Sequence, residues 1–193
     1  KHEAAILAWN EVQPLLLKAK KYDRVMAGAE AVLAAEPDNS VAAYNALQAK
    51  EQLGDFDGII MWSGKTVEAA RKKLAKPKPA GADDAAVWER ETDYARQVIV
   101  RCEYAYYAAT LRTAEPKTLM ALFEALEASN PDSQYIIMAG GRYLLALAQQ
   151  KEFAKALQWG EKEASKKQAN EEVLIYLADA SLTPTRDNDK EIG

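Results

Sequence analysis

Few residues of this chain could carry out chemistry at an active site. The sequence contains one cysteine, Cys102, and one histidine, His2. A cysteine nucleophile needs an activating base, and His2 is a hundred residues away, at the start of the sequence. Cys102 also falls at helical spacing among the apolar residues Val98, Ile99 and Tyr106, so we expect a buried structural thiol. A single cysteine excludes an intramolecular disulfide and a cysteine-built metal cage.

The carboxylates give no clear catalytic pattern either. Those near the end of the sequence are Glu161, Glu163, Glu171 and Glu172, which we interpret as solvated helix faces and a helix start. We therefore predict no catalytic residues, no cofactor and no metal site. One enzymatic alternative stays open, a pair of acids assembled by the fold. It would require a deep pocket holding two acidic groups of raised pKa.

Two further clusters favour structural roles. Basic residues gather at the end of a predicted helix, where cations suit the helix dipole: Arg71, Lys72, Lys73, Lys76 and Lys78. A patch for an anionic partner is the alternative. The pair Gly140-Gly141 follows no strand and precedes no lysine-serine pattern, which excludes a phosphate loop. Because glycine weakens a helix, the pair indicates close helix packing or backbone exposed to a ligand.

Composition excludes several classes of protein. The chain has 193 residues, of which 25 are basic and 29 acidic, so its net charge is −4. A nucleic-acid-binding domain would carry a basic surplus. Hydrophobic residues make up 49% and charged residues 28%, a mix typical of globular domains. No apolar run approaches the roughly 20 residues of a membrane span, so we predict no nucleic acid and no membrane span.

Turn and breaker residues divide the chain into helices. Glu36-Pro37-Asp38-Asn39 and Asn130-Pro131-Asp132-Ser133 are stops followed by caps, and Leu53-Gly54-Asp55 is a tight turn between helices. No alternating strand pattern of useful length occurs. The predicted helices span about 4–19, 23–35, 40–53, 56–75, 84–112, 116–129, 133–150, 152–167 and 170–182. The short turns between them make neighbouring helices antiparallel.

A period of 34 residues relates two parts of the chain. Tyr22-Asp23 recurs as Phe56-Asp57, and an apolar helix follows each pair. Phe56 and Trp62 have the same spacing as Phe153 and Trp159. We therefore predict that Phe56 and Phe153 are equivalent, each buried at the turn between two helices.

This pattern resembles the tetratricopeptide-repeat (TPR) family, whose units are helix–turn–helix pairs of about 34 residues. The matching residues are Trp9, Tyr22, Pro37, Tyr44, Asn45, Gly54, Phe56, Pro131 and Phe153. The match covers roughly 20–60 and 130–165 and is weak over 75–130, where the helix 84–112 is too long for a standard unit. Pro14 also departs from the pattern and indicates a kink or a late helix start.

The resemblance implies an all-α fold, a right-handed superhelix of stacked antiparallel helix pairs in a single array. The units would span approximately 4–37, 38–75, 84–130 and 131–168, with a closing helix at 170–182. The apolar residues of the long helix form two stripes, one containing Val98 and Cys102 and the other Val100 and Tyr104. A helix that is apolar on two sides is expected to be sandwiched between partners.

The resemblance also implies a function, a protein–protein interaction scaffold or adaptor without catalysis. The first helix of each TPR unit lines a concave groove, which here would include Tyr44, Asn45, Gln48, Arg101, Tyr104 and Arg142. Such residues suit an extended peptide, with its carbonyls on Asn45 and its acidic side chains on the arginines. The family's carboxylate clamp is not matched, because Asn10 and Pro14 replace its first Lys and Asn.

Several alternatives remain open at this stage. The chain, which begins at Lys1, could be a helical fragment or arm of a larger enzyme or envelope assembly. Its composition resembles that of bacterial envelope TPR proteins after signal removal, which implies a secreted or periplasmic location, with the cytoplasm as the alternative. If the groove did not bind, the convex side with Trp62 and Trp159 would be the next candidate. The sequence leaves the partner's identity and the oligomeric state undetermined.

Overall fold

The computed structural model describes residues 2–166 and 171–182, and nine α-helices are found there. They are α1 (His2–Lys18), α2 (Tyr22–Ala35), α3 (Ser40–Leu53), α4 (Phe56–Leu74), α5 (Ala82–Arg112), α6 (Pro116–Ser129), α7 (Gln134–Gln149), α8 (Phe153–Ala164) and α9 (Glu171–Leu182). These residues contain no strand, which confirms the all-α prediction. Every helix bound lies within three residues of its predicted position. α1 runs through Pro14, which excludes the late start.

Local capping explains where α3 and α4 begin and end. The Asn39 side chain accepts a hydrogen bond from the backbone N–H of Ala42 at 3.0 Å and starts α3. Gly54 ends α3 with a φ of +67°, a left-handed conformation that glycine adopts without a Cβ penalty. Asp55 then accepts from the backbone N–H of Gly58 at 2.9 Å and starts α4. The turn predicted at Gly54 is therefore built by a C-cap and an N-cap in succession.

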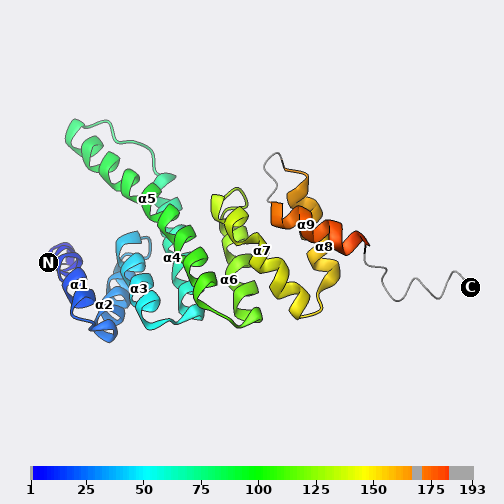
Figure 1. Ribbon diagram of the computed structural model, residues 1–193. Helices are drawn as coiled ribbons and strands as arrows, with labels where there is room; N and C mark the ends of the chain where they lie inside the picture. The colour runs from blue at the N-terminus through cyan, green and yellow to red at the C-terminus, as the bar shows by residue number, and fades with distance from the viewer. Residues whose placement is uncertain (1, 167–170, 183–193) are drawn as a thin grey trace, which may run out of the picture.

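Packing follows the order of the chain. Each helix packs against the next, and each odd-numbered helix also packs against the next odd-numbered helix, from α1 to α9. Among the described residues, helices more than two positions apart in the chain do not contact each other. Figure 1 shows this as a row of helices running from blue α1 to red α9. The odd-numbered helices therefore form one continuous layer.

α5 is the element that departs most from a regular helix pair. It has 31 residues, whereas its partner α6 has 14. Its N-terminal turns project beyond the neighbouring helices at the top of Figure 1. They are attached to α4 by an ion pair between Glu91 and Lys73, and to the loop after α4 by the Trp88 indole N–H, which donates to the carbonyl of Lys76 at 3.1 Å. The extra helical length is thus held in a defined place.

An aromatic cluster fills the core between α6, α7 and α8. The rings of Phe123 and Tyr143 stack with centroids 4.1 Å apart, and Trp159 meets both edge-on at 5.3 and 5.4 Å. Gly140 lies beneath the indole, since a Cβ added there would come within 2.8 Å of Trp159. Close helix packing therefore explains Gly140, one of the two alternatives for the glycine pair.

The prediction that Phe56 and Phe153 are each buried is wrong. Phe56 is half-buried against the main core, whereas 56% of the Phe153 side chain is exposed. Both residues are the first of their helices, α4 and α8, and α8 is contacted by α7, by α9 and, through Trp159, by Phe123 of α6. Trp62 and Trp159 are both buried, at 2% and 6% exposure, so neither is available for the convex binding surface considered above.

Candidate functional site

Two predicted groove residues, Tyr44 and Arg101, lie together where α3 passes α5. The guanidinium carbon of Arg101 is 5.9 Å from the centre of the Tyr44 ring, a cation–π distance. Further along both helices, Arg112 donates to the backbone carbonyl of Glu51 at 2.9 Å. Residue numbers therefore increase together along the contact, which means that α3 and α5 run in the same direction.

Tyrosine rings connect α5 to α7. The Tyr135 ring of α7 stacks on Tyr107 of α5 with centroids 5.3 Å apart and meets Tyr104 edge-on at 5.8 Å. Aromatic pairs at such distances add stability beyond their buried area. The side chain of Tyr104 is nevertheless 53% exposed, so one face of this cluster is open to a partner.

The side chain of Arg142 is exposed, and its guanidinium also has a structural role. One of its guanidinium nitrogens donates to the carbonyls of Thr110 and Thr113, at 3.0 and 3.2 Å. The last carbonyls of a helix have no partner inside the helix, so Arg142 satisfies groups at the C-terminal end of α5. It also holds α7 beside α5. The two helices run parallel, because Tyr135, near the start of α7, contacts residues of α5 that precede Thr110.

Asn45 does not reach the surface that it was expected to line. Its side chain is 6% exposed, and its amide is in hydrogen-bond contact with that of Gln13, which is fully buried in α1. This polar pair joins α1 to α3 from within, so a bound peptide cannot hydrogen-bond to Asn45. Gln48, one turn further along α3, is half-buried at the surface.

The exposed residues of α5 and α7 form the most distinctive surface. From Gln97 onward in α5 and throughout α7 they are Gln97, Val100, Arg101, Tyr104, Leu111, Arg112, Gln134, Met138, Arg142, Leu145 and Gln149, a set that we name the odd-helix face. Its charged members are three arginines, and it contains no carboxylate. The chain as a whole has a net charge of −4, so this face opposes the charge of the protein.

Apart from Tyr104, which was predicted to line the groove, the apolar members of this face were not recognised as surface residues in the sequence. Val100 and Tyr104 were expected in the second of two sandwiched stripes, although Tyr104 was also predicted to line the groove; both, like Leu111, are 50–53% exposed. That expectation is wrong because α3 and α7 lie beside α5 and leave its outer side uncovered. Met138 and Leu145 of α7, at 54% and 59% exposure, extend the same apolar strip. Their seven-residue spacing, two helical turns, was the signal available in the sequence.

The residues considered for chemistry are in structural environments. Cys102 is fully buried, as predicted, and burial raises the pKa of its thiol to about 12. Such a thiol stays protonated at neutral pH and is a poor nucleophile. Within the described part of the chain, no group of three or more His, Cys, Asp or Glu side chains could hold a metal ion.

The buried acids do not form a pair. Glu103 of α5 accepts hydrogen bonds from the Asn130 amide at 2.9 Å and the Ser133 hydroxyl at 2.7 Å. Glu163 of α8 forms an ion pair with Lys166 at 2.7 Å. Each carboxylate therefore has a polar or charged partner, as expected of a structural group.

The basic cluster at the end of α4 is internally satisfied. Its members interact as follows: Arg71 with the Ser129 carbonyl, Lys72 with Glu68, Lys73 with Glu91, Lys76 with Asp38 and Lys78 with Glu89. These contacts favour the solvated helix end over a patch for an anionic partner.

The chain was also compared with known proteins. No family model matches it, and neither a curated protein nor a solved structure matches it. None of the described helices combines the length and the apolar character needed to cross a membrane.

Proposed function

We propose that the chain is a protein-interaction module whose odd-helix face binds a partner segment that is both acidic and apolar. The observation that carries the proposal is the composition of this face, which contains three arginines, five large apolar or aromatic residues and no carboxylate. No catalytic role is included in the proposal.

Charge supports an acidic partner. Exposed arginines on an otherwise acidic protein attract acidic segments and repel basic ones, which favours the correct encounter. Arg101 rests on the Tyr44 ring, which leaves its charge available, whereas Arg112 contacts the Glu51 carbonyl, and its charge partly opposes the rise in the pKa of the Glu51 carboxyl that burial causes. A carboxylate of the partner could form a charge-assisted hydrogen bond with either of them.

The exposed apolar residues of the odd-helix face support a role in binding a partner. Contiguous exposed apolar residues rimmed by polar ones mark interaction sites, whereas single exposed residues are ordinary. Tyr104, Val100 and Leu111 of α5 and Met138 of α7 are each about half exposed, and Tyr104 contacts Tyr135 of α7. Tyrosine and arginine are among the residues that dominate binding energy at interfaces.

We further propose that the helix pairs are TPR-like units wound into a right-handed superhelix. The 34-residue period of the sequence supports this arrangement, and so does the packing of each odd-numbered helix on the next. The odd-helix face would then be the concave side, which the resemblance assigns to partner binding.

The proposal can be tested with two synthetic peptides that share their apolar residues but carry Glu or Lys at the polar positions. Fluorescence anisotropy should detect binding of the acidic peptide and not of the basic one. Binding should weaken as salt is added, because the contacts are exposed to solvent. The combined change Arg101→Glu and Met138→Asp should weaken the acidic peptide about tenfold or more.

A matched control makes the same chemical changes on the other side of the molecule. Arg24 of α2 and Met61 of α4 are also exposed, so Arg24→Glu with Met61→Asp should leave the binding affinity unchanged. Far-UV circular dichroism verifies that both variants retain their helices. Equal affinity of the acidic peptide for wild type and the Arg101 variant would contradict the proposal.

A further inference from the structure

The first and last described helices lie at opposite ends of the row (Figure 1). α1 is packed by α2 and α3, and α9 is packed by α7 and α8, so each has a side that no other described helix covers. The terminal units of stacked-helix proteins normally carry a polar outer face, which keeps them soluble. The exposed side chains of α1 and α9 depart from this rule.

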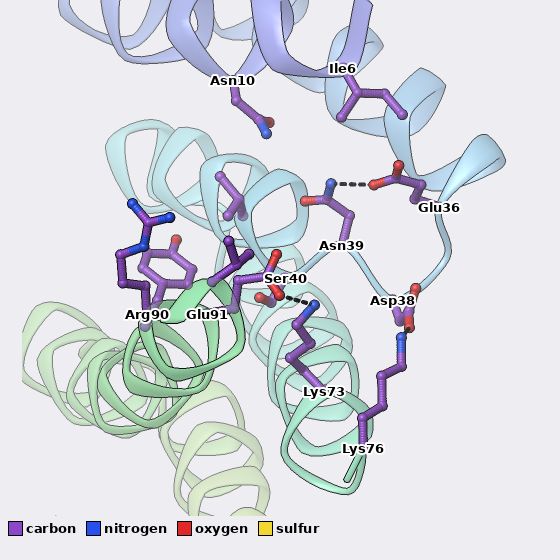
Figure 2. Close-up of a pocket in the computed structure, with 13 residues that line it drawn as sticks. Ile6, Asn10, Glu36, Asp38, Asn39, Ser40, Lys73, Lys76, Arg90 and Glu91 are labelled. Atoms are coloured by element: carbon purple, nitrogen blue, oxygen red, sulfur yellow. Dashed lines mark hydrogen bonds and ion pairs between the residues drawn. The ribbon is translucent and has the colours of Figure 1, made fainter. Parts of the chain in front are cut away.

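α1 exposes apolar residues on the side that points away from the row. Figure 2 shows Ile6 and Asn10 on the side of α1 that faces a pocket beside α3 and α5, and Gln13 contacts α3 from that side as well. Leu15 follows Ile6 by nine residues, about two and a half helical turns, so it lies on the opposite side of α1. Its side chain is 65% exposed, and that of Val12, one turn earlier, is 39% exposed.

α9 is also buried on one side and apolar on the other. Val173 is 1% exposed and lies against α7, 3.6 Å from the position of a Cβ added at Gly140. Ile175 comes two residues later, about 200° further around the helix, and is 55% exposed. Leu174 is 46% exposed, and Ala178, one turn after it, is exposed as well. The side of α9 that turns away from α7 is therefore apolar.

The charges beside these two apolar surfaces are opposite in sign. The exposed charged side chains described in α9 are Glu171 and Asp179, both acidic. The last residue of α1 and the turn after it carry three exposed lysines: Lys18, Lys20 and Lys21. Glu11, two turns before Lys18, is the only exposed acid among the described side chains of α1. Opposite charges favour contact between an α9 surface and an α1 surface, whereas two α9 surfaces would repel each other.

We propose that α9 of one copy of the chain stacks on α1 of a second copy, so that chains associate head to tail. The contact continues the stacking inside the chain, where α3, α5 and α7 lie side by side and parallel. Leu174 and Ile175 of one copy pack against Val12 and Leu15 of the next. Because the contact joins two different surfaces, a pair of chains keeps one surface of each kind unoccupied, and further copies can add. The proposal does not depend on the function of the odd-helix face.

Analytical ultracentrifugation of the full chain provides the first test. The mean mass should rise with protein concentration above that of a single chain, through dimers to larger species. Added salt should lower the mean mass, because the charged groups are exposed to solvent. Lys18→Glu should weaken the association at low salt, because it places like charges on both surfaces. A mass that stays at that of one chain up to about millimolar concentration would overturn the proposal.

Two single substitutions then test which surfaces meet. Leu15→Glu disrupts the α1 surface and Ile175→Glu the α9 surface, so each should weaken self-association about tenfold or more. In an equal mixture each variant supplies the surface that the other lacks, so dimers should form again, but nothing larger. A mixture that associates no better than either variant alone would mean that like surfaces meet, and the proposal would be wrong.

Met61→Glu is the matched control for these substitutions. Met61 is 47% exposed on α4, away from both end surfaces, so its variant should associate like wild type. A loss of association as large as that of Leu15→Glu would show that any added charge has this effect, which would also overturn the proposal. Far-UV circular dichroism verifies that each variant keeps its helices.

Discussion

At the scale of single residues, Gly28 determines how closely α1 can approach α2. A Cβ added there would lie 1.5 Å from the Trp9 indole, so Gly28→Ala must displace the ring or the helix. We expect a loss of about 1–3 kcal/mol in the free energy of unfolding, the range typical of overpacking. Gly64→Ala is the control, because a Cβ there meets nothing within 4 Å and alanine is the better helix former. Chemical denaturation should give the two substitutions opposite signs.

Two phenylalanines provide a second residue-scale test, because their burial differs strongly. Phe123 is fully buried between Tyr143 and Trp159, whereas Phe153 is 56% exposed. Phe123→Ala should cost about 3–5 kcal/mol through lost burial and a cavity. Phe153→Ala should cost less than about 1 kcal/mol. Comparable losses from urea denaturation would show that Phe153 is covered in solution.

At the scale of elements, the turn between α3 and α4 is expected to depend on pH. A hydrogen bond from Lys50, and next one from the Gly58 backbone, hold the pKa of Asp55 below its ordinary value of 3.8. The folded state thus favours the ionised carboxylate, which stabilises the protein above the unfolded pKa and ceases to do so as pH falls through the lower, folded pKa. Asp55→Ala should cost about 1 kcal/mol at neutral pH, and the difference from wild type should shrink below about pH 4.

The matched variant for this cap is Asp55→Asn, which retains a capping oxygen but removes the charge. It should keep most of the stability at neutral pH, because asparagine and aspartate cap helices about equally. Urea denaturation at several pH values separates the two effects. A destabilisation by Asp55→Ala that persists undiminished well below pH 3 would show that the charge of Asp55 contributes nothing.

Helix ends were predictable from the sequence because their causes are local. Asn39, Gly54 and Asp55 act on residues within four positions, so their chemistry can be interpreted without a fold. Exposure was less predictable, because it depends on which other helix covers a side. Val100 falls at an apolar helical spacing, yet no helix covers it, and Phe153 is the first residue of α8, where more than half of it stays exposed.

The candidate binding surface likewise contains residues whose placement the sequence predicted and one whose placement it did not. Tyr104, Arg101 and Arg142 were chosen for their position on odd-numbered helices, and the packing of these helices does place all three at the surface. Asn45 was chosen in the same way, but its position in α3 faces Gln13 of α1 instead. A repeat pattern assigns residues to helices reliably, whereas the rotation of one helix against the next is decided by side-chain packing across the contact.

At the scale of the whole molecule, the contact pattern predicts an elongated particle. Described helices contact only partners one or two positions away, so no contact folds one end of the row onto the other. A compact protein of 193 residues would have a radius of gyration of about 16 Å. Small-angle X-ray scattering should give a clearly larger radius and a distance distribution with a long tail. A radius near 16 Å with a symmetric distribution would mean that the helices close into a compact bundle, which would remove the open layer on which the odd-helix face depends.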